Sequence, residues 1–137
     1  IVGKGILFDK IKNMVINLKL QESVNLVGQK DRDELIKLYN ESEVFVLSSI
    51  WEGFAKVLLE AMSCGCKVIS TNVDSAPILL GNWGYMIPHS DSESICEKLK
   101  NLLERKDYEF DSQIKSVNNF SWDYVRNLYS EHLLIIK

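Results

Sequence analysis

The sequence predicts an α/β fold: a doubly wound, Rossmann-like parallel sheet flanked by helices. Along the 137 residues, short continuous apolar runs alternate with stretches of helical periodicity. Runs such as Val44–Leu47 are typical of strands that are buried on both faces, as in a parallel sheet covered by helices. Such folds bind ligands beyond the carboxyl ends of their strands, so we expect a site in the strand-to-helix loops.

The predicted strands are short apolar runs that end in glycine, serine or proline. The chain opens on what reads as the end of a strand, and the last strand is closed by Pro88. We expect strands at 1–2, 24–27, 44–47, 68–69 and 85–87.

The predicted helices lie between these strands and after the last one. Gly65 is expected to end the helix at 55–63, Asp91 or Ser92 to cap the helix at 91–105, and Ser121 to cap the last. In the second helix, Leu35, Ile36, Leu38 and Tyr39 form the expected inner face. We expect helices at 7–18, 31–40, 55–63, 91–105, 108–118 and 123–136, and a short helical turn around Pro77 within 72–82.

Composition restricts the class of protein. A net charge of −3, with 46% apolar and 26% charged residues, gives no reason to expect a nucleic-acid partner. No apolar run approaches the length of a membrane span. The three cysteines include Cys64 and Cys66, but no histidine nearby completes a metal site, so we interpret them as small buried residues in a reducing cytoplasm.

Residues 48–62 are the most informative stretch of the chain. They predict a strand end, a glycine-bearing turn and the start of an amphipathic helix, with seven residues between Glu52 and Glu60. The first N–H groups of a helix favour anions such as phosphate. Glu60 would lie about two turns further on, on roughly the same face, where its carboxylate could accept hydrogen bonds from hydroxyls. This combination suits a sugar nucleotide.

The order of these motifs resembles a known family. Glu52-Gly53-Phe54 leads into Leu59-Glu60-Ala61-Met62, after an apolar strand that ends in Ser48-Ser49. This pattern is similar to the C-terminal, donor-binding domain of group 1 (family 4) glycosyltransferases, which have the two-domain GT-B architecture. The resemblance extends over nearly the whole chain. The chain departs from the family at Ala55, where glycine is usual, and at 73–78, where a Gly-Gly-x-Pro-Glu run is usual.

The resemblance implies a retaining, metal-independent transferase with no cofactor, which moves a sugar from a nucleoside-diphosphate sugar to an acceptor hydroxyl. The donor would be a UDP-sugar, with a GDP-sugar as the other possibility. The acceptor would be a glycan or lipid-linked sugar in bacterial surface polysaccharide synthesis. It also implies one catalytic residue and a set of donor contacts. These are Glu52 as the catalytic residue and Gly53, Phe54, Ala55, Val57, Glu60, Gly28, Gln29 and Lys30 as donor-binding residues.

We therefore expect 1–137 to be a single donor-binding domain, truncated at its N-terminus and inactive without the acceptor domain. The full protein would be cytoplasmic and could contact the inner membrane face peripherally. A non-catalytic nucleotide-binding domain would share the same loops and stays an alternative. A receiver-type signalling domain needs an acidic cluster at the strand ends, whereas these strands end in Gly28, Ser48 and Ser70.

Overall fold

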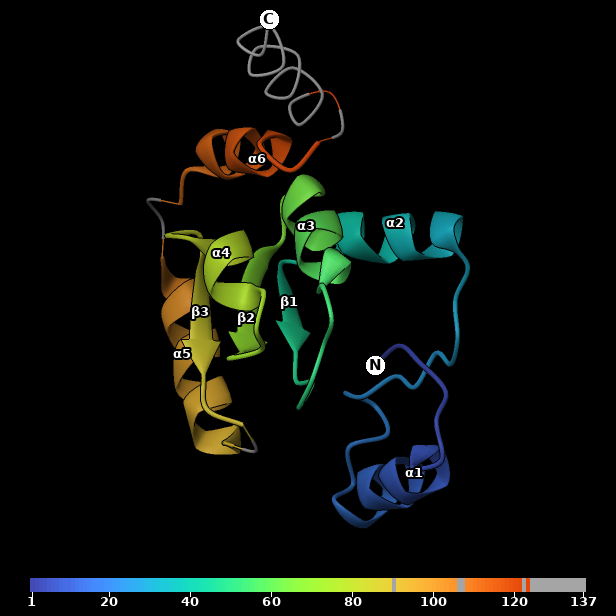
Figure 1. Cartoon of the computed structure of the whole chain (residues 1–137). Helices are drawn as coiled ribbons and strands as arrows, with labels where there is room; N and C mark the ends of the chain where they lie inside the picture. The colour runs from blue at the N-terminus through green and yellow to red at the C-terminus, as the bar shows by residue number, and fades with distance from the viewer. Residues whose placement is uncertain (90, 106–107, 122, 124–137) are drawn as a thin grey trace, which may run out of the picture. The chain divides into compact units, whose positions relative to one another are not determined.

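The structure is a computed structural model that describes residues 1–89, 91–105, 108–121 and 123. The chain forms two compact units, Ile1–Lys37 and Leu38–Lys137. Figure 1 labels the helices and strands. Helix α2 (Arg32–Glu41) begins in the first unit and ends in the second.

The first unit holds helix α1 (Phe8–Asn17) and the start of α2, but not the two strands predicted at 1–2 and 24–27. That prediction was wrong: a single parallel bridge joins Val2 to Gly28. Its backbone bonds include Gly3 N–H to the Gly28 carbonyl at 2.7 Å. Val2 is 47% exposed, so no apolar layer covers this short pairing and extends it into a ladder.

The second unit is built on a parallel sheet, as the sequence predicts. Its three strands are adjacent in the order in which they occur along the chain. They are β1 (Val44–Leu47), β2 (Lys67–Thr71) and β3 (Gly84–Ile87). The crossovers between them contain α3 (Lys56–Ser63) and α4 (Ala76–Leu80), the latter being the short turn expected around Pro77.

Helices cover both faces of this sheet, which confirms the predicted fold class. Ile69 of β2 and Ile87 of β3 pack with Leu102 of α5 (Ser92–Glu104). Val68, adjacent to Ile69, points to the opposite face because side chains alternate along a strand. Helices α3 and α4 pack on the strands, and Figure 1 shows α4 in front of them and α5 behind. All five residues of β2 are buried as a result.

The predicted helix boundaries are met by specific backbone and side-chain bonds. Gly65 adopts φ +83° and ends α3, with its N–H donating to the Met62 carbonyl at 3.1 Å. The Cys66 N–H donates to the Ala61 carbonyl at 3.0 Å, which completes a Schellman motif. Asp91 caps α5 by accepting a 2.9 Å bond from the Ser94 N–H, as expected.

Three further helix predictions have different outcomes. Ile36 was expected on the inner face of α2 but is 41% exposed, whereas Tyr39 is buried as predicted. Helix α6 (Phe110–Asn118) matches the helix predicted at 108–118. The helix predicted at 123–136 lies outside the described residues, except for Asp123.

Gly84 lets α4 approach the sheet closely. A Cβ at this position would lie 2.9 Å from the Val68 carbonyl oxygen and 3.0 Å from Cδ2 of Leu80. Because the oxygen belongs to the backbone of the central strand, it has little freedom to move. We predict that Gly84→Ala lowers the free energy of unfolding by about 1–3 kcal/mol. Urea denaturation measures the change, with Gly5→Ala as the control because nothing lies within 4 Å of its added Cβ. Equal stability of the two variants would contradict the prediction.

Candidate functional site

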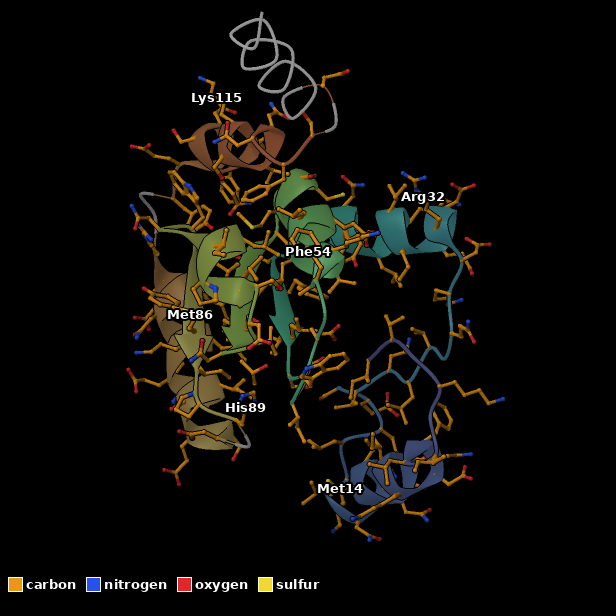
Figure 2. All side chains as sticks on the ribbon, viewed as in Figure 1. Met14, Arg32, Phe54, Met86, His89 and Lys115 are labelled. Atoms are coloured by element: carbon orange, nitrogen blue, oxygen red, sulfur yellow. The ribbon has the colours of Figure 1, made fainter. Side chains whose placement is uncertain are left out.

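The loop that joins β1 to α3, residues 48–55, contains four of the nine predicted site residues. It leaves the carboxyl end of the sheet, where such folds bind ligands. Glu52 is half-buried, Gly53 and Phe54 are exposed, and Ala55 is buried. Figure 2 shows Phe54 close to the start of α3. A Cβ on Gly53 would meet nothing within 4 Å, so the space beside this backbone is open.

A chain of hydrogen bonds holds the Glu52 carboxylate. Thr71, at the end of β2, donates its hydroxyl to the Ser49 carbonyl at 2.5 Å. Ser49 in turn donates its own hydroxyl to Oε1 of Glu52 at 2.7 Å. A hydroxyl bond to a carboxylate at this distance is charge-assisted and stronger than a neutral one. The orientation of Glu52 therefore depends on the neighbouring strand as well as on its own loop.

A second bond fixes the end of the same loop. The Ala55 N–H donates to Oγ of Ser75 at 3.0 Å, and both residues are buried, with 1% and 7% exposed surface. Ser75 lies between β2 and α4, in another of the loops where the sequence predicts a site. In this structure the backbone amide of Ala55, one of the predicted donor-binding residues, is therefore paired within the protein.

The start of α3 follows directly on the site loop. Its N-cap, Ala55, has no side-chain group that could accept from the first N–H groups of the helix. Backbone carbonyls accept from two of them: the Lys56 N–H donates to the Phe54 carbonyl at 2.8 Å, and the Leu58 N–H donates to the Ala55 carbonyl at 2.9 Å. The helix dipole favours negative charge at this end.

The other two predicted residues on α3 face different surroundings. Val57 is half-buried, whereas the Glu60 carboxylate is exposed. Oε2 of Glu60 accepts a 3.3 Å hydrogen bond from the Tyr39 hydroxyl. Burial, and secondly the charge of Glu60, raises the pKa of Tyr39 to about 12, so this hydroxyl stays protonated at neutral pH.

The first unit contains Gly28, Gln29 and Lys30, whereas the other predicted site residues belong to the second unit. Gly28 adopts φ +70°, a left-handed conformation that glycine tolerates best. Lys30 forms an ion pair with Glu34 at 2.7 Å, and this bond lowers the pKa of the Glu34 carboxyl. Gln29 is exposed.

Two observations concern the described residues as a whole. None of their His, Cys, Asp and Glu side chains gather in a group of three that could hold a metal ion. None of the helices in this part of the chain is both long and apolar enough to cross a membrane.

Sequence reasoning missed four side chains that hold the site. Ser49 was part of the motif but had no assigned role, and Tyr39 was expected only as an inner-face residue. Thr71 could have been noticed as a polar residue at the end of a strand buried along its whole length. Nothing in the sequence links Ser75 to Ala55, because the two residues are brought together by the β2 crossover.

Removing the Ser75 hydroxyl should leave the Ala55 N–H buried without an acceptor. We predict that Ser75→Ala lowers the free energy of unfolding by about 1–3 kcal/mol. Ser63→Ala is the matched control, because that exposed hydroxyl bonds only to the Leu59 carbonyl of its own helix. Its effect should stay within about 0.5 kcal/mol. Urea denaturation of both variants checks the difference, and a Ser75→Ala chain as stable as the wild type would refute it.

Curated relatives resemble the chain in sequence. It is 33% identical over 107 residues to a Campylobacter jejuni protein named N-acetylgalactosamine-N,N'-diacetylbacillosaminyl-diphospho-undecaprenol 4-alpha-N-acetylgalactosaminyltransferase, with 76% of this chain and 29% of that protein covered. It is 31% identical over 139 residues to the UDP-Gal:alpha-D-GlcNAc-diphosphoundecaprenol alpha-1,3-galactosyltransferase of Escherichia coli, with 94% and 35% covered. The chain thus spans about a third of the length of these relatives.

Solved structures resemble it in fold. A glycosyltransferase from Rickettsia africae matches with a TM-score of 0.78 and 26% identity, over 94% of this chain and 36% of that one. HepE from Anabaena, in complex with UDP and glucose, matches with a TM-score of 0.78 and 19% identity, over 96% of this chain and 39% of that one. The family model described as "Glycosyl transferases group 1" matches residues 1–118, which is most of the chain. The chain therefore belongs to the group 1 glycosyl transferases.

Proposed function

We propose that this chain is the donor-binding part of an enzyme that transfers a sugar from a nucleoside-diphosphate sugar to an acceptor hydroxyl. One observation carries the proposal: a hydrogen bond holds the carboxylate of Glu52 in the loop that leads from the carboxyl end of a parallel strand into α3, and the exposed Glu60 lies further along that helix. Family membership supports the same reaction class. UDP is the favoured nucleotide, since HepE and the pneumococcal O-GlcNAc transferase GtfA share this fold and were solved with UDP and a sugar.

The donor is proposed to lie along the start of α3. The N–H groups of Gly53 and Phe54 bind the diphosphate, and the dipole of α3 adds to the attraction, because fixed dipoles stabilise an anion without reorganising. Val57 packs against the nucleoside, and Glu60 accepts hydrogen bonds from the ribose hydroxyls. Gly28, Gln29 and Lys30 are proposed to contact the base. Ala55 would contribute through its place in the loop, since its N–H is already paired with Ser75.

The proposed reaction breaks the bond between the anomeric carbon of the sugar and the diphosphate oxygen. The electron pair leaves with the diphosphate, and the acceptor oxygen forms the new bond on the same face while its proton passes to the departing diphosphate oxygen. Positive charge develops on the sugar ring, and a nearby carboxylate such as that of Glu52 stabilises it. Negative charge grows on the diphosphate, which the start of α3 stabilises. The proposal involves retention of configuration and requires no metal or cofactor.

The acceptor is proposed to be a glycan or a lipid-linked sugar, bound through an N-terminal domain of the whole enzyme. Two relatives are named for sugar transfer to diphospho-undecaprenol-linked acceptors, and another is an O-antigen chain mannosyltransferase. An enzyme with such an acceptor works in the cytoplasm at the inner membrane face, to which it would bind peripherally.

The direct experiment is an NMR titration of this chain with UDP, GDP and ADP, each with and without an attached sugar. We predict that UDP and UDP-sugars shift amide signals at 52–60 and 28–30, while ADP leaves them unchanged. The titration with GDP tests the other proposed donor, a GDP-sugar. If no nucleotide shifts these signals at millimolar concentration, the donor-site proposal fails. Sugar transfer by the full-length enzyme then separates a transferase from a domain that only binds nucleotides.

The role of Glu60 can be tested by removing its carboxylate. We predict that Glu60→Ala weakens UDP binding by about 1–3 kcal/mol, because a charge-assisted hydrogen bond to ribose is lost. Glu104→Ala, at an exposed position of α5, is the matched control and should bind UDP like the wild type. Calorimetric titration measures both affinities. Unchanged affinity in a folded Glu60→Ala chain would remove the ribose assignment.

A further inference from the structure

Tyr39 is placed more rigidly than the residue it contacts. It lies near the end of α2, in the second unit, and only 7% of its surface is exposed. Its ring packs edge-on against Phe45 of β1, with 5.6 Å between ring centroids and an angle of 74°. Its backbone carbonyl accepts a 3.1 Å bond from the Cys66 thiol. The hydroxyl is thus carried on a fixed ring.

That hydroxyl is directed at Glu60, which is exposed and sits on the neighbouring helix α3. The 3.3 Å bond engages Oε2 of the carboxylate. Burial keeps the pKa of Tyr39 near 12, so the hydroxyl stays a donor over the physiological pH range. Oε1 of Glu60, and the second lone pair of Oε2, stay available to accept from a ligand.

An exposed glutamate normally samples several rotamers, and fixing one when a ligand binds costs conformational entropy. A hydrogen bond from a buried, immobile donor restricts the carboxylate before the ligand arrives. This lowers the entropy cost of binding, as with other preorganised sites.

We propose that Tyr39 is a positioning residue for nucleotide recognition: it holds the Glu60 carboxylate in the orientation that accepts hydrogen bonds from the ribose hydroxyls. This inference rests on the proposed donor site. It assigns a role to a side chain on α2 that contacts no ligand itself.

The contribution of the Tyr39 hydroxyl can be measured without removing the ring. Phenylalanine at this position would keep the edge-on packing against Phe45 and the backbone bond to Cys66. Glu60 would remain exposed to water, so losing its partner leaves no buried group unsatisfied. Tyr39→Phe is therefore expected to fold like the wild type, and its NMR spectrum checks this.

The experiment titrates the 137-residue chain with UDP and with 2′,3′-dideoxy-UDP, which lacks both ribose hydroxyls. We expect Tyr39→Phe to weaken UDP binding by about three- to tenfold, as for one hydrogen bond. Its affinity for the dideoxy nucleotide should equal that of the wild type. Tyr85→Phe is the matched control, a half-buried tyrosine on β3 whose ring packs on the α5 side of the sheet.

A double-mutant cycle shows whether Tyr39 acts through Glu60. In the Glu60→Ala background, adding Tyr39→Phe should change UDP affinity no further. Additive losses would overturn the inference, and so would equal losses for UDP and the dideoxy nucleotide. An unfolded Tyr39→Phe chain would overturn it as well, because the hydroxyl would then serve the fold. If the wild type binds no UDP, the proposed function fails too. If the wild type binds and only the cycle is additive, the inference on Tyr39 fails alone.

Discussion

The site depends on hydrogen bonds that cross from one strand connection to the next. The loop after β1 contains few groups that could fix it from within, and several of its side chains are exposed. Thr71 and Ser75, both on the β2 side, bond to the backbone of this loop near its beginning and its end. Because β2 is buried along its whole length, these bonds attach the loop to a strand that packing holds in place. The geometry around Glu52 is therefore set by the sheet.

The bond between the two loops depends on one departure from the family pattern. Residues 73–78 stand where a Gly-Gly-x-Pro-Glu run is usual, and they include Ser75, whose hydroxyl oxygen accepts from the Ala55 N–H. Any residue except proline at position 55 has this N–H, so the bond between adjacent loops depends on the serine and not on the alanine.

Much of the fold could be predicted from the sequence, because periodicity and helix ends are local properties. The sheet, the turn around Pro77, the stop at Gly65 and the cap at Asp91 all follow from residues close in the chain. The strand expected at 24–27 failed because an apolar run does not show whether anything covers it. The site loop was identified, but Tyr39, Ser75 and Thr71 lie 20 to 22 residues from the site groups to which they bond, a separation over which local patterns carry no information.

A residue outside every predicted motif also holds the C-terminal end of α3. The buried amide of Gln113, on α6, donates to the Met62 carbonyl at 2.9 Å and to the Cys66 carbonyl at 3.1 Å. Its side-chain oxygen accepts from the Tyr108 hydroxyl. These bonds attach the C-terminal end of α3, the helix that carries Glu60, to a segment that follows the last strand. The smallest autonomous piece of chain with an intact site must therefore extend well past the sheet, through Gln113, although every residue proposed to touch the donor lies before position 61.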